Sequence, residues 1–280
     1  MPGQSRYIFV SNALVALSAA LGMHTSHAQS SDSPFTPREL REQSREFRPS
    51  RIQAMILESV PQKQSDGEFK FSGNIGGSVS KGNDSTSSAS LPIELDVTHV
   101  ASGVTLALST DLHAWSRENG ETIHGAGAST AKLTRKWDVV KDQSSLTGRV
   151  AATFDSGSAV SDPNSRLVAL VYGQKLSDLM SMSVVGNLVQ GPRIDTPGIS
   201  RNVVAASVRL NRAIGANNEH TAWAKFGASR RNGAGSRTNL MLGLDFVFQP
   251  EIWEGTLSVA RGLTGPSRTT AIGLDISRLF

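Results

Sequence analysis

The residues of this chain best suited to chemistry are charged side chains at alternate positions of long, otherwise apolar segments. The acidic ones are Glu94, Asp96, Asp111, Asp245, Glu254 and Asp275, and the basic ones are Lys132, Arg149, Arg209 and Lys225. Alternate residues of a strand share one face, so these charges point away from their apolar neighbours. Charges gathered along a polar interior attract and orient ions and dipolar solutes. We predict that these residues, together with His113, line such an interior.

The histidines make a weak case for catalysis. His113 follows Asp111 by two residues, so both side chains are expected on one face of a strand, and His124 lies near Glu118 and Glu121. An imidazole beside a carboxylate can activate a nucleophile, but no serine is placed within reach of either histidine. We therefore predict no catalytic residue, no cofactor and no metal site, and we interpret the histidines as solvated.

Composition excludes several further classes of protein. The chain has no cysteine, which excludes a disulfide framework, a thiolate metal site and a lipid anchor on cysteine. Its formal net charge is +4 and its lysines and arginines form no run, so the sequence does not indicate a nucleic-acid partner.

The elements that must position the charges are long segments of alternating character with no helical period. Twelve of them can be counted, at residues 68–80, 90–100, 104–115, 126–140, 144–155, 165–176, 179–190, 202–212, 220–230, 237–248, 252–262 and 268–280. Such alternation predicts strands. A length of about ten residues is what a tilted strand needs to cross a bilayer, and it is about twice the usual length of a globular strand.

The connections between these segments alternate in length. Short ones lie at residues 101–103, 141–143, 177–178 and 249–251, and longer polar ones at residues 81–89, 116–125, 156–164 and 191–201. Short turns at one end and longer loops at the other are typical of outer-membrane barrels. The connection at 213–219 is longer than this pattern requires, and ten or fourteen strands remain open.

Each segment has one apolar and one polar face. Leu91, Ile93, Leu95 and Val97 alternate with polar residues, and the next segment reverses the parity. A soluble sandwich is the alternative, but twelve long strands would leave edges that need protection, and closure into a barrel removes them. Aromatic residues at segment ends, where a membrane interface would lie, are Trp115, Trp137, Trp253 and Phe280.

The chain ends in the middle of its last alternating segment, with Ile272, Leu274, Ile276 and Phe280 on one face. This ending resembles the C-terminal signal of Gram-negative outer-membrane β-barrel proteins, which the barrel assembly machinery recognises. The resemblance implies an all-β fold: a closed antiparallel transmembrane β-barrel of about twelve strands with a short N-terminal helical segment. It also implies location in the cell outer membrane and contact with its lipid.

The N-terminal residues have a different character. Residues 1–28 are predicted to be a secretory signal peptide, with an apolar stretch at 7–23 and small residues at the cleavage site. Residues 29–66 are expected to form a periplasmic helical lead, because Thr36, Pro37 and Glu39 suit a helix start. A plug inside the barrel is the alternative for residues 36–60. Residues 67–280 would form the barrel.

We interpret the chain as a porin-like channel for passive passage of small hydrophilic solutes. An export conduit for a polysaccharide or polypeptide and a non-conducting scaffold are the alternatives. The acidic residues come from the second, third and tenth to twelfth segments, whereas the basic residues, with Lys136, come from the fourth, fifth, eighth and ninth. In a closed ring these sets oppose each other, which would create a transverse field as in general porins. Alternatively, neighbouring charges pair along the wall.

Overall fold

The computed structural model describes residues 69–82, 87–118, 121–161, 164–191, 200–215, 219–233, 235–248, 253–264 and 270–279. These residues form strands β1 (Phe69–Gly82), β2 (Ser87–His99), β3 (Val104–Glu118), β4 (Glu121–Gly125), β5 (Ser129–Val140), β6 (Ser144–Phe154), β7 (Ser165–Lys175), β8 (Met180–Gln190), β9 (Asn202–Ile214), β10 (His220–Arg231), β11 (Gly235–Phe248), β12 (Trp253–Gly262) and β13 (Thr270–Leu279). No helix among them is long and apolar enough to span a membrane. The predicted signal peptide and helical lead lie outside the described residues.

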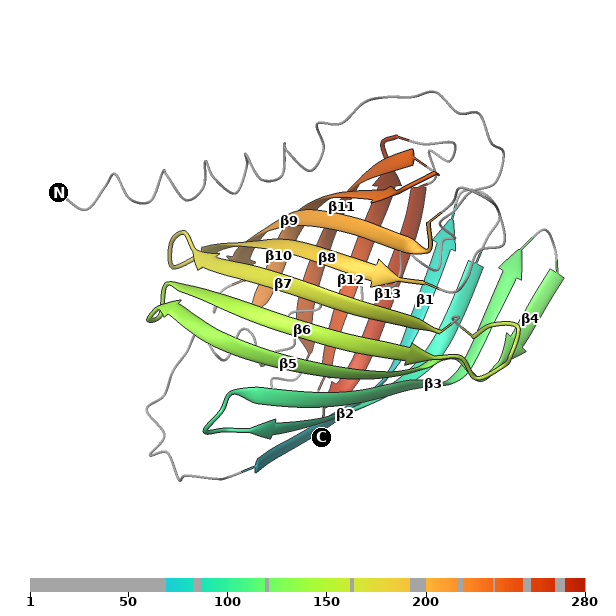
Figure 1. Ribbon diagram of the computed structural model, residues 1–280, viewed down its shortest axis with the longest axis horizontal. Helices are drawn as coiled ribbons and strands as arrows, with labels where there is room; N and C mark the ends of the chain where they lie inside the picture. Colours follow the sequence, from blue (N-terminus) through green and yellow to red (C-terminus); the bar gives the residue numbers. More distant parts are fainter. Residues whose placement is uncertain are drawn as a thin grey trace.

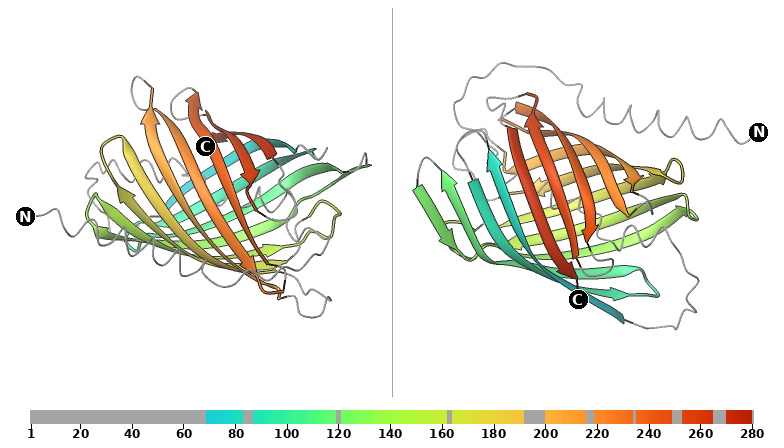
Figure 2. Two further views of the ribbon diagram at one scale, coloured as in Figure 1. Left: turned by 90° about the horizontal axis from the view of Figure 1, so that it is seen from above. Right: turned by 180° about the vertical axis from the view of Figure 1, so that it is seen from behind.

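Twelve strands form a closed antiparallel barrel, and β4 is an additional strand. The first and last strands close the ring, since β1 pairs with β13 from Asn74↔Leu279 to Gly82↔Ala271. Figures 1 and 2 show the strongly tilted ring, with the red C-terminal strands beside the cyan first strands. The predicted closed barrel is confirmed. Each of the twelve predicted segments forms one ring strand, and no strand end differs from its predicted position by more than three residues.

The extra strand β4 was predicted to be loop. It pairs only with the C-terminal end of β3, from Ala114↔Gly125 to Glu118↔Glu121, so this hairpin extends beyond the ring at that end of the barrel. The Asn119-Gly120 dipeptide between the two strands is a strong hairpin signal that could have revealed it. The loop after β6 packs beside this extension, where the Ser156 hydroxyl donates to the carbonyl oxygen of Ala126 at 2.8 Å.

The two faces of the wall follow the predicted alternation. Register pairs Leu95 with Leu108 and Leu106 with Leu133, and these side chains are exposed on the outside. The inward neighbour Ala107 is 2% exposed, as is Met241 on the opposite side of the ring. An exposed aliphatic outer surface is what a barrel in hydrocarbon requires, because its apolar side chains contact lipid and not a protein core.

One irregularity reverses the parity of a strand. Pro92 pairs with Asp111, but Leu91 pairs with His113, so Leu112 is an extra residue that forms a β-bulge. Proline has no N–H for the ladder, and strand prolines are accommodated at bulges. Beyond the bulge His113 takes the side of exposed Leu91, which is the outer face. The expectation that His113 shares the inward face of Asp111 is therefore not met.

Substitution by arginine should separate the two faces. Leu106→Arg or Leu242→Arg places a charge against mid-bilayer lipid and should lower the free energy of unfolding by about 2–4 kcal/mol. The inward Ser109→Arg, beside Glu94 in the register, serves as the matched control and should cost far less. Urea unfolding in lipid vesicles measures the difference. Equal losses at Leu106 and Ser109 would contradict a lipid-facing surface.

Candidate functional site

The candidate site is the inward face of the barrel. Strand pairing puts the other predicted pore-lining residues on the face opposite the exposed aliphatic side chains, namely Glu94, Asp96, Asp111, Lys132, Arg149, Arg209, Lys225, Asp245, Glu254 and Asp275. Their part in solute passage stays a prediction. The structure does show which of them meet.

Arg209 and Asp245 form the best-defined cluster on this face. Arg209 is 4% exposed, and its Nη2 donates to Asp245 Oδ2 at 2.7 Å. Its Nε donates to Asn211 Oδ1 at 2.6 Å. The other carboxylate oxygen of Asp245 accepts from Trp223 Nε1 and from the Thr256 hydroxyl, both at 2.9 Å. One carboxylate thus joins side chains of β9, β10 and β12 to its own strand β11.

Trp223 is a structural part of this cluster. The Arg209 guanidinium carbon lies 4.3 Å from the centroid of the indole ring, a cation–π contact. The ring edge lies against Gly243, where an added Cβ would come 2.2 Å from the Trp223 Cζ2. Trp223 is 7% exposed, so it does not offer a free ring face on which a sugar could stack. Gly243 is also a poor site for any larger inward residue.

A second ion pair lies on the other side of the ring. Lys132 Nζ on β5 is 3.0 Å from Glu94 Oε1 on β2, although β3 lies between these strands. The inward residue of β3 beside Lys132 is Ala107, whose small side chain leaves room for this reach. Asn74 on β1 donates to the other Glu94 oxygen at 3.4 Å. Both groups are partly exposed, so the pair is weaker than the buried Arg209 pair.

Both ion pairs join one of the predicted acidic pore-lining residues to one of the predicted basic ones. Each spans one intervening strand, so its charges meet along the wall and not across the bore. The structure therefore supports wall pairing for Glu94, Lys132, Arg209 and Asp245.

An apolar strip that the sequence analysis missed separates the two groups of basic residues. It lies on β7, β8 and the N-terminal end of β9. Its inward apolar members are Leu167, Ala169, Val171, Val185, Val189 and Val203, with the polar Asn187 among them. The segment from Leu167 to Val171 is apolar at every position. That loss of alternation is the signal that could have predicted a strand apolar on both faces.

The described His113 and His124 do not form a reactive cluster on the inward face. The His113 and His124 rings lie 6.2 Å apart, where β4 pairs with the C-terminal end of β3. Within the described part of the chain, no group of three histidine, cysteine or acidic residues could hold a metal ion.

Comparisons with known proteins agree with this architecture. No protein-family model matches the chain, and neither does any curated protein. An outer-membrane channel from Pseudomonas putida F1 is 13% identical with a TM-score of 0.54, over 79% of this chain and 98% of that one. The NanC porin is 7% identical with a TM-score of 0.51, over 74% and 98%. The KdgM porin, solved with oligogalacturonate, is 11% identical with a TM-score of 0.50, over 73% and 98%.

The chain has the fold of outer-membrane porins. Its closed twelve-strand ring and exposed aliphatic outer surface fit the outer membrane of a Gram-negative cell.

The two ion pairs should differ in their contribution to stability. Asp245→Asn keeps the shape of the side chain but leaves the buried Arg209 without its counter-charge, so the free energy of unfolding should fall by about 3–5 kcal/mol. Glu94→Gln, at the more exposed pair, is the control and should cost about 1 kcal/mol or less. Urea unfolding in vesicles, followed by tryptophan fluorescence, measures both. Similar losses would contradict the difference in burial.

Proposed function

We propose that this porin-like barrel is a channel for passive passage of small hydrophilic solutes. The observation that carries the proposal is the closed ring itself, with polar side chains on the inward face and ion pairs such as Lys132–Glu94 and Arg209–Asp245 held along the wall. A barrel of twelve strands has an interior wider than that of eight-strand barrels, which side chains fill, and narrower than that of the large porins.

The sector built from β1, β2, β12 and β13 is a hydrophilic part of the wall. Its inward hydroxyls pair across strands, with Ser78 Oγ 2.8 Å from Ser90 Oγ and Ser80 Oγ 2.9 Å from Ser88 Oγ. Asp275 lies beside Ser78 in the register. Hydroxyl and carboxylate groups can exchange hydrogen bonds with water or with a hydrated solute, as passage of polar molecules needs. The apolar strip on β7 and β8 faces this sector across the ring.

Conductance tests the proposal directly. Refolded residues 29–280 and the shortened residues 67–280 are each inserted into planar bilayers. Both should show stepwise ohmic currents, because the ring is complete in either chain. If only the shorter chain conducts, residues 36–60 act as a plug, as the sequence alternative holds. If neither conducts although both migrate as folded barrels on gels, passive passage is excluded and a scaffold role replaces it.

Charge selectivity tests whether the predicted residues line the conducting path. Asp111→Asn with Asp275→Asn should shift the reversal potential in a salt gradient toward anions, and Arg149→Gln should shift it toward cations. These shifts should shrink in 1 M salt, where the Debye length is about 3 Å. Arg261→Gln, on the outward face of β12 beside exposed Leu240, is the control and should cause no shift. Unchanged potentials in all the variants would place these residues away from the path.

The partners follow from the same proposal. Ile272, Leu274 and Ile276 are exposed on the outer face, as a lipid contact requires, and Phe280 lies outside the described residues. We propose that these four residues form the signal read by the barrel assembly machinery. The amount of Phe280→Asp protein that reaches the outer membrane is the measurement that decides it.

A further inference from the structure

Negative charge is confined to one face of the described barrel wall. Among the described side chains of the twelve ring strands, every aspartate and glutamate is on the inward face. Lysine and arginine also occur on the outer face, within two residues of a strand end except for Arg135, which lies in the middle of β5 beside the first residue of β3. At the end of the ring opposite Phe69 and Leu279 they are Lys81, Arg117, Arg166, Arg230 and Arg261, and toward the other end they are Arg135, Arg212 and Arg278. Two outward rings of positive charge therefore border the aliphatic surface.

Two of the three cations toward the end nearer Leu279 contact tryptophan rings. The Arg135 guanidinium lies 5.3 Å from the ring centroid of Trp137, and that of Arg278 lies 5.9 Å from the ring centroid of Trp253. At the opposite end, no described carboxylate lies within salt-bridge distance of Arg166 or of Arg201, which immediately precedes β9.

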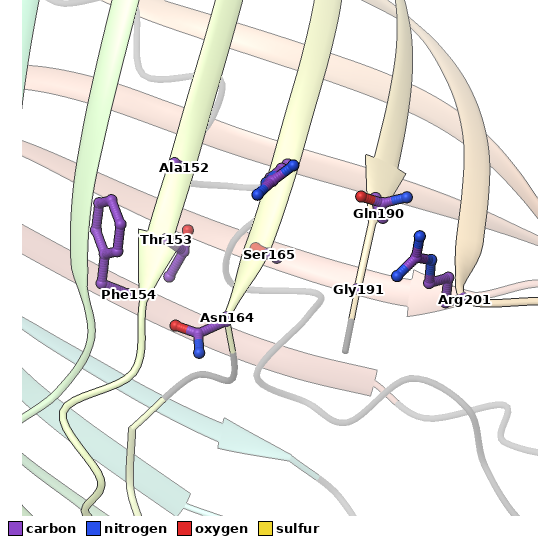
Figure 3. Close-up of a pocket in the computed structure, with 9 residues that line it drawn as sticks. Ala152, Thr153, Phe154, Asn164, Ser165, Gln190, Gly191 and Arg201 are labelled. Carbon is purple, nitrogen blue, oxygen red and sulfur yellow. The ribbon is translucent and has the colours of Figure 1, made fainter. Parts of the chain in front are cut away.

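Arg166 and Arg201 line a groove at the rim of the barrel. The C-terminal ends of β6 and β8 and the N-terminal ends of β7 and β9 meet there. Its volume is about 470 Å³, and its lining includes Phe154, Ala152 and Gln190 (Figure 3). The register places Ala152 beside Arg166 and Arg166 beside Gln190. The small side chain of Ala152 leaves open space next to Arg166, and Phe154 is 55% exposed at the end of the same strand.

The guanidinium of Arg201 is held in place. With its amide oxygen turned toward the guanidinium, Gln190 accepts from Arg201 Nη2 at 3.0 Å and from Nε at 3.2 Å. The backbone is fixed as well, because the Gly191 N–H donates to the Arg201 carbonyl oxygen at 2.9 Å. A guanidinium oriented in this way is suited to bind a planar or tetrahedral oxyanion with its remaining N–H groups.

An aliphatic row lies next to the groove, two residues further toward the middle of the strands than Ala152, Arg166 and Gln190. Val150, Val168, Leu188 and Val204 are neighbours in the register, and each side chain is about half exposed, at 48%, 56%, 46% and 56% respectively. The surface thus presents cations above and hydrocarbon below. A lipid with an anionic headgroup has the same order of groups.

We propose that this groove binds a phosphate-bearing lipid of the outer leaflet, with its phosphate at Arg166 and Arg201 and its acyl chains along the aliphatic row. The groove lies at the rim, where its lining also includes the inward Thr153 and Ser165, but Phe154, Arg166 and Gln190 are outward and continue onto the aliphatic row, so we assign its occupant to the membrane. Closely set aliphatic side chains favour acyl chains over a polar protein surface. The proposal does not depend on solute conduction, since Arg166, Gln190 and the aliphatic row are on the outward face.

Native mass spectrometry of the detergent-solubilised barrel tests the proposal, with lipid A carrying two phosphates as the probe. Arg166→Gln with Arg201→Gln should weaken binding about tenfold or more, as expected for lost charge-assisted hydrogen bonds. Arg117→Gln with Arg261→Gln removes the same charge at the same end but away from the groove, and it should leave the affinity unchanged. Ala152→Trp keeps both arginines but fills the groove, and it should also weaken binding. Heat-modifiable gel mobility verifies folding of each variant.

Two further arms separate the lipid from other ligands. Dephosphorylated lipid A should bind the wild-type barrel about tenfold more weakly, because the oxyanion is missing. Inorganic phosphate in millimolar excess should not displace lipid A, since it lacks acyl chains. Equal weakening in both double-arginine variants would show that only general surface charge matters and would overturn the groove. Displacement by inorganic phosphate would likewise overturn a lipid ligand in favour of a free anion.

Discussion

The pairing of the first strand with the last is the interaction on which the structure depends. In hydrocarbon no water is present to satisfy backbone N–H and C=O groups, so an open sheet edge is too costly. The β1–β13 ladder, nine residue pairs from Asn74↔Leu279 to Gly82↔Ala271, removes both edges at once. With the ring closed, each ring strand has exactly one inward and one outward face. The placement of charged and apolar side chains follows from this division into two faces.

On the inward face, charged side chains pair with partners on nearby strands of the wall. Arg209 and Lys132 both extend across one strand to reach a carboxylate, and small or flat neighbours make this possible. Ala107 leaves space under Lys132, and Gly243 admits the Trp223 ring beside Arg209. A buried guanidinium needs this much support, because desolvating it costs several kcal/mol unless hydrogen bonds and a counter-charge replace the water. The result is a wall with defined polar clusters and an apolar strip on β7 and β8.

On the outward face, the placement of charge is determined by contact with lipid. Lipid tolerates aliphatic side chains at every depth but tolerates charge only near the headgroups, where long cationic side chains can reach phosphate. Apart from Arg135 in the middle of β5, the described outward arginines and lysines accordingly lie within two residues of a strand end, and described outward carboxylates are absent from the ring strands. The same depth rule that excludes charge from the middle of the wall places the groove of Arg166 and Arg201 at its rim.

The local sequence determined much of this protein by itself. A period of two is a property of each segment alone, so twelve strands, their approximate ends and the lipid-facing residues such as Leu106 and Leu242 could be predicted. Ring closure was also predictable, because so many long strands must hide their edges. What only the tertiary structure decided depends on neighbouring strands. The bulge at Leu112, which turns His113 outward, arises from pairing with the strand of Pro92. The partners of Arg209 and Lys132 lie two strands away, at positions set by register and by small residues between them, and neither of these is encoded in the alternation of a single segment.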